Sequence, residues 1–268
     1  MLRLFYVLQL ADNALIHSQL LSAWCGHGPI LEQDIAITNT ALDHIGQARS
    51  LYQYASELLN ALPESEKAAA FSSPLLQQVS RAVQEDDLSS LRDGWDFRNV
   101  VLVEQPNGDW AQTIAKSFFY DVFQYLLYQE LLKSPDTQLS AIAEKSIKEV
   151  TYHKKWSSEW VIRLGDGTAE SHDRMQKAVD TLWSYTGELF MPSEADAFAF
   201  QSGMAPDVAV LKDSWLAEVT AIFDQATLQL PSNNWMQKGG KQGMHTEHLG
   251  YVLTDLQFMQ RAYPNMEW

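Results

Sequence analysis

The chain of 268 residues carries 34 acidic against 19 basic residues, a formal net charge of −15, and 46% of its residues are hydrophobic. So acidic a surface repels phosphate backbones, which argues against nucleic acid as a partner and implies that the cations around any phosphate-bearing ligand come mostly from another chain. No apolar run is long enough to span a membrane, the N-terminus lacks a signal-peptide cleavage pattern, and the single cysteine, Cys25, cannot form an intrachain disulfide; together these features predict a cytoplasmic protein.

Two long helices are predicted at the start of the chain, because apolar residues recur there at helical spacing. The first covers about 3–24 and ends at a GHGP turn, and the second covers about 31–61 and ends before Pro63. The connection that follows, 62–95, is polar, acidic and rich in Ser and Ala. We interpret it as a variable surface segment with a short helix near 75–84.

A second pair of long helices follows the turn QPNG at 105–108. Asp109 is placed to N-cap a helix over about 110–133, and another covers about 138–164. Two long helices, a long connection and two more long helices are typical of a ferritin-like four-helix bundle with one crossover. We therefore expect one all-α domain over the whole chain, extended by helices near 171–190, 206–229 and 246–262.

Four acidic side chains stand where such a bundle places the ligands of a di-iron centre. In that template one carboxylate precedes its hairpin partner by about thirty residues, as helix length and turn dictate. Asp12 precedes Asp43 by 31 residues, and Asp121 precedes Glu149 by 28. The spacing and the order of the four carboxylates therefore match the template.

The histidines of the template are displaced. Two of its helices carry Glu-x-x-His, which points both side chains at one metal. Gly46 and Tyr152 stand at those i+3 positions, whereas His44 and His153 stand at i+1 and i+4. One residue is about 100° around a helix, so His44 points away from the ligand face while His153 stays close to that of Glu149.

Three interpretations of these positions stay open. The favoured one is a relic that has lost its metal, in which a hydrogen-bonded network fills the interior and the carboxylates are protonated or paired with His44, His153 or a lysine. The second is that the stripes of small and polar residues on the second and third long helices are solvent faces unrelated to metal; they consist of Ala36, Asn39, Thr40, Asp43, Gly46, Gln47 and Ser50, and of Ser117, Asp121, Gln124, Tyr125 and Tyr128. The third is a working di-iron site. The relic positions are Asp12, Asp43, Gly46, Asp121, Glu149, Tyr152 and His153, and the working site would use all of them except Gly46 and Tyr152.

Four further segments carry a resemblance to a known family. They are AWCGHGPILEQDIAITNTALDHIGQAR at 23–49, VLVEQPNGDWAQTIAKSFFYD at 101–121, KSIKEVTYHKKW at 145–156 and GGKQGMHTEHLG at 239–250. The sequence resembles the C subunits of the bacterial phenylacetyl-CoA ring epoxidase, a multicomponent monooxygenase of aerobic phenylacetate degradation. The resemblance covers nearly the whole chain except 62–95, which looks like an insertion.

The resemblance implies a ferritin-like, non-catalytic structural subunit with no metal or other cofactor of its own. A ferritin-like sister subunit would carry the di-iron centre, epoxidise the aromatic ring of the CoA thioester, and pair with this chain in a heterodimer that doubles to a heterotetramer. The resemblance also implies a small accessory subunit that would join them, and a reductase with flavin and an iron–sulfur cluster that would deliver electrons from NADPH.

The resemblance also places the segment before the third long helix near the acyl-CoA. Here that segment is Asp96, Phe97, Arg98 and Asn99. Arg98 suits a phosphate or carbonyl oxygen, and Phe97 suits stacking on an adenine or on the pantetheine arm. The alternative is that Phe97 belongs to the core and that Arg98 is a surface cation.

Two other functions stay open beside the structural one. The chain could itself be a di-iron oxygenase or oxidase subunit, or a metal-free helical binding protein that acts alone. Near the C-terminus, His245 and His248 have a spacing that suits a metal on one helix face. Thr246 and Glu247 between them favour the simpler interpretation of a capped helix start.

Overall fold

The computed structural model describes residues 1–232, 235–263 and 266, and within these residues the chain forms helices and no β-strand. The predicted all-α class is confirmed. The chain divides into two compact units, one made of Met1–Glu104 with Gly239–Trp268 and the other of Gln105–Lys238. The expectation of a single domain stays a prediction.

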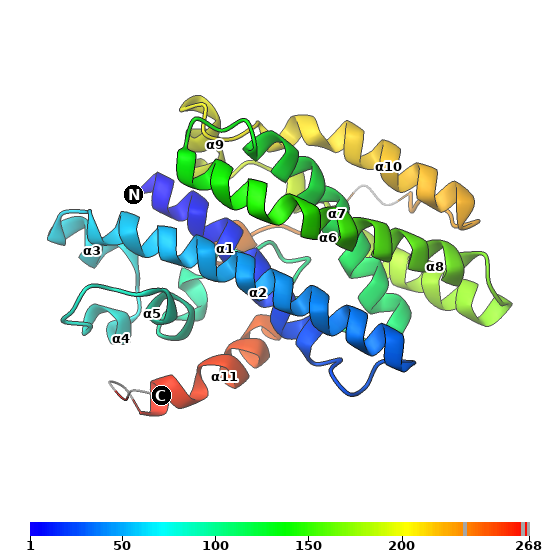
Figure 1. Cartoon of the computed structure of the whole chain (residues 1–268), viewed down its shortest axis with the longest axis horizontal. Coiled ribbons are helices and arrows are strands. Elements are labelled where there is room, and N and C mark those ends of the chain that lie inside the picture. The colour runs from blue at the N-terminus through cyan, green and yellow to red at the C-terminus, as the bar shows by residue number, and fades with distance from the viewer. Residues whose placement is uncertain (233–234, 264–265, 267–268) are drawn as a thin grey trace. The chain divides into compact units, whose positions relative to one another are not determined.

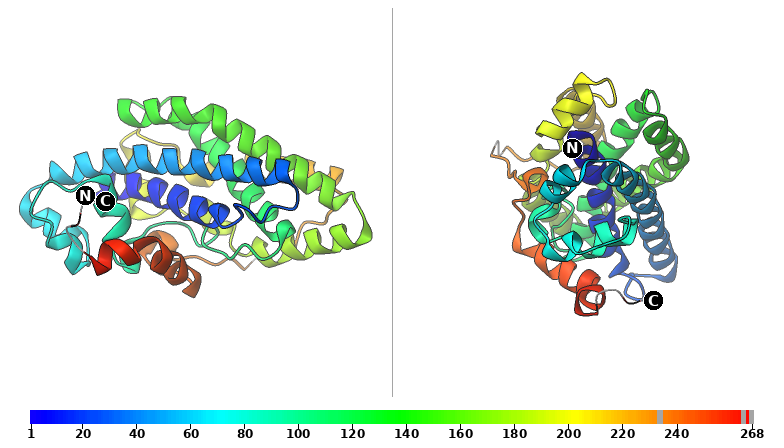
Figure 2. Two further views of the ribbon diagram at one scale, coloured as in Figure 1. Left: turned by 60° about the horizontal axis from the view of Figure 1, so that its bottom comes forward. Right: turned by 90° about the vertical axis from the view of Figure 1, so that its left-hand side faces the viewer.

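The first unit is built on two long antiparallel helices, α1 (Leu2–Ser22) and α2 (Leu31–Asn60), which lie side by side in Figures 1 and 2. Both agree with the predicted ranges to within two residues. The turn between them is held by Asp34, whose carboxylate accepts a hydrogen bond of 2.9 Å from the Gly28 N–H.

The connection after α2 differs from the prediction of a surface segment with one helix near 75–84. Residues 78–84 are not helical. One short helix ends before them and has Ser73 as its N-cap, and another begins after them at the Gln84–Asp87 capping box. Several of its side chains are buried, among them Phe71, Leu88 and Arg92. Part of this connection is therefore core. Its helices are α3 (Glu64–Ala70), α4 (Pro74–Gln77), α5 (Glu85–Ser90) and the 3-10 helix η1 (Gly94–Asp96).

The C-terminal segment completes the first unit. It forms a short 3-10 helix, η4 (Gly240–Gln242), and then α11 (Glu247–Ala262), which packs against α1, α5 and η1. Gly243, between η4 and α11, has φ +80°, and a Cβ there would overlap the Trp95 carbonyl oxygen. A glycine is therefore required where this segment passes η1.

The second unit contains the other predicted pair of long helices, α6 (Trp110–Leu131) and α7 (Thr137–Gly165), which also pack side by side. The predicted N-cap of α6 is confirmed, because the Asp109 carboxylate accepts the Gln112 N–H at 3.0 Å. Gly108 just before it adopts φ +57°, as the turn prediction requires.

The rest of the second unit consists of shorter and more numerous helices than predicted. The helix expected near 171–190 ends early and is followed by a 3-10 turn, and the one expected near 206–229 is preceded by another. An unpredicted helix begins at a capping box in which Ser193 and Asp196 bond each other's backbone N–H groups. The elements are α8 (Ala169–Trp183), η2 (Gly187–Phe190), α9 (Glu194–Gln201), η3 (Val208–Val210) and α10 (Leu211–Gln225).

Many of the aromatic side chains fill the core of this second unit. Phe119 packs against Trp183, Trp215 and Phe223, with ring centroids 5.8–6.1 Å apart. The Trp215 indole N–H also donates to the Phe119 carbonyl oxygen at 2.9 Å. Within the part of the chain that the structure describes, no helix combines the length and the apolar character needed to cross a bilayer.

Candidate functional site

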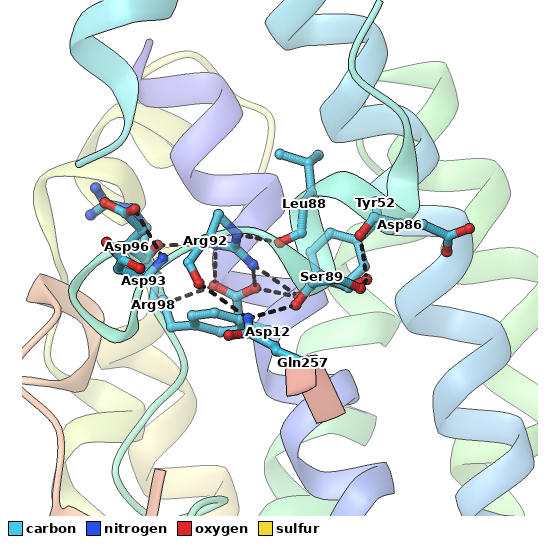
Figure 3. Close-up of polar contacts among 12 residues, drawn as sticks. Asp12, Tyr52, Asp86, Leu88, Ser89, Arg92, Asp93, Asp96, Arg98 and Gln257 are labelled. Carbon is cyan, nitrogen blue, oxygen red and sulfur yellow. Dashed lines mark hydrogen bonds and ion pairs between the residues drawn. The ribbon is translucent and has the colours of Figure 1, made fainter. Parts of the chain in front are cut away.

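Asp12 lies in the middle of α1, fully buried, at the first expected ligand position. Its two oxygens accept hydrogen bonds from both terminal nitrogens of Arg92, from the Tyr52 hydroxyl at 2.5 Å and from the Arg98 backbone N–H at 2.8 Å. Figure 3 shows these contacts converging on the carboxylate. A carboxylate offers about four lone-pair sites, and here all of them are used.

The partner of Asp12 is Arg92, which comes from the connection between α5 and η1 and is also fully buried. Besides Asp12, its guanidinium donates to the carbonyl oxygens of Leu88 and Asp96 and to the Tyr52 hydroxyl, at 2.5–3.1 Å. All five guanidinium N–H donors are therefore satisfied. Burial by itself lowers the pKa of Arg92, but the neighbouring Asp12 carboxylate reverses this and raises it, so the ion pair persists.

A second buried carboxylate, Glu104, ties the C-terminal segment to the end of the connection. One of its oxygens accepts from the N–H and hydroxyl of Thr246, at 2.6 and 2.8 Å. The other accepts from Asn99 at 2.9 Å and from His245 Nδ1 at 2.8 Å. Thr246 thus occupies the predicted N-cap position of α11, but its hydroxyl bonds Glu104 rather than the helix backbone.

His245 has an acceptor at each ring nitrogen, because its Nε2 lies 3.0 Å from the Phe97 carbonyl oxygen. Only the doubly protonated imidazolium donates to both acceptors. Burial lowers the pKa of His245, but the hydrogen bond and charge of Glu104, with smaller effects from Phe97 and Asp12, raise it overall. Both ring nitrogens of His245 are thus hydrogen-bonded. Neither is available to bind the metal that the spacing of His245 and His248 suggests.

The segment 96–99, expected near the acyl-CoA, is mostly committed to this network. The Asp96 carboxylate accepts from the backbone N–H groups of Ser72 and Ser73, and Phe97 is fully buried with the Arg92 guanidinium 4.1 Å from its ring centroid. Arg98 differs from both. Its guanidinium stacks on Phe5 at 3.8 Å, and its buried Nε makes no hydrogen bond to any described residue.

The remaining first-hairpin positions do not repeat the ligand pattern. Asp43 is half-buried, and Gly46 offers no side chain. His44 points into the unit rather than towards solvent, and its ring meets that of His17 of α1 edge to face, with centroids 4.9 Å apart. Of the polar side chains on this face of α2, Thr40 and Gln47 are buried, whereas Asn39 is exposed.

In the second unit, Asp121 of α6 and His153 of α7 are fully buried, whereas Glu149 is half-buried and Tyr152 is 47% exposed. Burial raises the pKa of Asp121 to about 6, against a smaller lowering by the charge of His153. The i+3 position after Glu149 therefore turns outward, and the displaced histidine is the one that reaches the interior.

These residues do not fit the ligand set of a di-iron centre. A bridging or terminal carboxylate needs lone pairs free for metal, and those of Asp12 are all used by protein donors. The two positions that carry histidine in the template hold Gly46 and an outward-facing Tyr152. No chemistry at iron is therefore derived for this chain.

Sequence reasoning missed the arginine. We expected the interior carboxylates to pair with a histidine or a lysine and took the connection to be surface. Arg92 lies 80 residues from Asp12 along the chain, so no local pattern joins them. The one available indication was chemical, since a buried carboxylate at mid-helix demands a cation or a proton.

Another missed residue is Lys116, which is fully buried in α6. Its amine donates to the Gln105 carbonyl oxygen at 2.6 Å and to Asn107 Oδ1 at 3.1 Å. Burial lowers the pKa of Lys116 to about 7. A neutral amine has two N–H donors, which match these two acceptors, so Lys116 fastens the QPNG turn to α6.

The fold and the site together define a class of protein. It is an all-α chain of ferritin-like fold in which protein donors occupy the lone pairs of Asp12, the carboxylate at the first expected ligand position. The chain belongs to the family described as phenylacetic acid catabolic protein, whose model matches residues 3–268. It is 43% identical over 263 residues to the C subunit of the 1,2-phenylacetyl-CoA epoxidase of Escherichia coli (strain K12), and this match covers 98% of each chain. The family resemblance seen in the sequence is confirmed.

Proposed function

We propose that this chain is a non-catalytic structural subunit of a multicomponent di-iron monooxygenase that epoxidises the aromatic ring of phenylacetyl-CoA. The observation that carries the proposal is the closed shell around Asp12, in which Arg92, Tyr52 and Arg98 take the place that a metal would need. The name of the Escherichia coli relative supports the reaction and the multisubunit assembly. Iron, flavin and the iron–sulfur cluster then belong to the other subunits.

The closed networks give this chain a stable shape for its partners. The pair of Asp12 and Arg92 joins α1 to the connection, and the pair of Glu104 and His245 joins the segment after η1 to the segment before α11. Buried ion pairs of this kind specify one arrangement even where they add little net stability. We infer that the chain acts by supporting the iron-bearing sister subunit, and that a small accessory subunit and a reductase complete the assembly.

Among the residues expected near the acyl-CoA, Arg98 is the one we propose as a ligand contact. Its guanidinium is partly buried and lacks an ion-pair partner among the described residues, so an anionic oxygen would satisfy it. Asp96, Phe97 and Asn99 would position the backbone that carries it. Arg98→Gln should raise KM for phenylacetyl-CoA and leave kcat nearly unchanged, because Arg98 binds the ligand without touching the reacting ring.

The proposed function is tested by reconstitution. The iron-bearing, accessory and reductase subunits are assayed for phenylacetyl-CoA-dependent product formation with and without this chain, and the copurified subunits are identified by mass spectrometry. We expect activity only when this chain is present, with the iron bound to the sister subunit. Full activity without it, or iron bound to this chain, would contradict the proposal.

A further inference from the structure

The outward face of the first half of α2 is apolar. Leu31, Ile35, Leu42 and Ile45 are between 36% and 72% exposed. At about 100° per residue these four side chains fall within an arc of about 80°, so they form one line along the helix, here called the α2 stripe. Lone exposed apolar residues are ordinary, but an aligned set on one helix face marks a contact surface.

The inward face of the same half-helix mixes apolar with polar side chains, because Thr40, His44 and Gln47 are buried there beside Ile37 and Ala41, whereas an amphipathic helix usually buries apolar side chains. Thr40, His44 and Gln47 lie on the opposite side of α2 and are at most 2% exposed. The second half of the helix is ordinary, with Leu51 buried and Gln53 exposed. The two halves of α2 therefore differ: of the two, only the first has strongly exposed apolar side chains.

The charges beside the stripe indicate what covers it. Between Leu31 and Ala48 the helix carries Glu32, Asp34 and Asp43 and no lysine or arginine. A second copy of this chain would bring the same acidic flanks into contact with each other, which is unfavourable. A complementary surface is an aliphatic ridge flanked by basic side chains. The stripe spans about 21 Å at 1.5 Å per residue, which matches about four turns of a packed helix.

We propose that the α2 stripe is the docking face for a long helix of the iron-bearing sister subunit, one that presents aliphatic side chains flanked by lysine or arginine. This inference rests on the proposed function, because it takes the chain to be one subunit of the monooxygenase. It adds the surface, the chemistry of the partner and the half of α2 that is used.

The test is copurification from cells that express this chain, tagged, together with the sister subunit. Ile35→Lys combined with Leu42→Lys places two charges in the stripe, at side chains that are 52% and 60% exposed, so folding should be preserved. Gln53→Lys combined with Glu57→Gln, which also changes the net charge by +2, is the matched control on the outward face of the second half of α2. We expect the stripe variant to lose about tenfold of the bound sister subunit and the control to keep it.

The possible results distinguish failure of the docking face from failure of the proposed function. Wild-type retention by the stripe variant overturns the docking face and leaves the proposed function standing, whereas a wild-type chain that retains no sister subunit overturns both. A chain that dimerises alone, and becomes monomeric in the stripe variant, assigns the stripe to a second copy and overturns the inference. If the stripe variant fails to fold, hydrogen–deuterium exchange on the wild-type complex tests the inference instead. Protection of residues 31–45 on assembly supports the docking face, and unchanged exchange overturns it.

Discussion

The residue that decides the character of the first hairpin is Arg92. Its guanidinium places a fixed positive charge against Asp12, where a ferritin-like metalloprotein holds a metal ion. Arginine suits this place because its five donors form a planar fork and it stays protonated even when buried. A lysine or histidine could neutralise the charge but could not bond Asp12, Tyr52, Leu88 and Asp96 together.

Removing one partner of this pair should be costly. Arg92→Met leaves the Asp12 carboxylate buried without its cation, so the free energy of unfolding should fall by about 3–5 kcal/mol. The double variant Asp12→Leu with Arg92→Met removes both charges and should lose much less than the sum of the single variants. Urea unfolding followed by circular dichroism measures all three. Additive losses would show that the two side chains are not coupled.

Lys116 should make the stability of the second unit depend on pH. The folded state lowers the pKa of Lys116 from 10.5 to about 7. Between these values the unfolded chain binds the proton and the folded chain does not, so stability rises with pH from about 7 to about 10. Thermal unfolding of the wild type and of Lys116→Met at pH 7 and pH 9.5 should give a steeper rise for the wild type. Parallel changes in the two proteins would contradict a lowered pKa.

Among the helices, the sequence predicts those whose position is determined by local patterns along the chain. The four long helices carry enough turns for apolar periodicity, and Asp109 and the QPNG turn set the start of α6 by chemistry local to the chain. Of the short helices, α3 and α5 escaped prediction and α4 covers only the start of the helix expected near 75–84, because segments of four to seven residues depend on caps and on packing against distant residues. The same limit applies to the site: its positions followed from spacing, but its partners are tertiary contacts.

The start of α11 should respond to pH in the opposite sense to Lys116. The folded state raises the pKa of His245, chiefly through Glu104 acting against burial. Its stabilising contribution is therefore complete below the unfolded pKa of about 6.5 and is lost as pH rises through the higher folded pKa. Hydrogen exchange of α11 at pH 6 and pH 8.5 should show loss of protection in the wild type.

His245→Gln is the control for that measurement, since glutamine keeps a donor for Glu104 but does not titrate. Its α11 should be less protected than the wild type at pH 6 and similar to it at pH 8.5. An equal difference at both pH values would mean that His245 does not titrate in this range.

For the whole molecule, we propose a role in assembly. In the first unit the buried carboxylates Asp12 and Glu104 are paired with Arg92 and His245, and the α2 stripe is exposed, where a partner can reach it. Asp43→Asn should therefore leave folding, assembly and epoxidase activity largely intact, because Asp43 is half-buried and supplies no ligand in this account. Severe loss of activity with fold and assembly preserved would argue for a catalytic carboxylate.

We propose that this chain holds no catalytic metal, and elemental analysis of the purified chain tests this proposal. The protein is expressed alone in iron-supplemented medium, challenged with ferrous iron, desalted and measured for iron per chain. The account predicts well below one iron atom per chain. About two iron atoms per chain, the stoichiometry of a di-iron site, would contradict it and would make this chain a catalytic candidate.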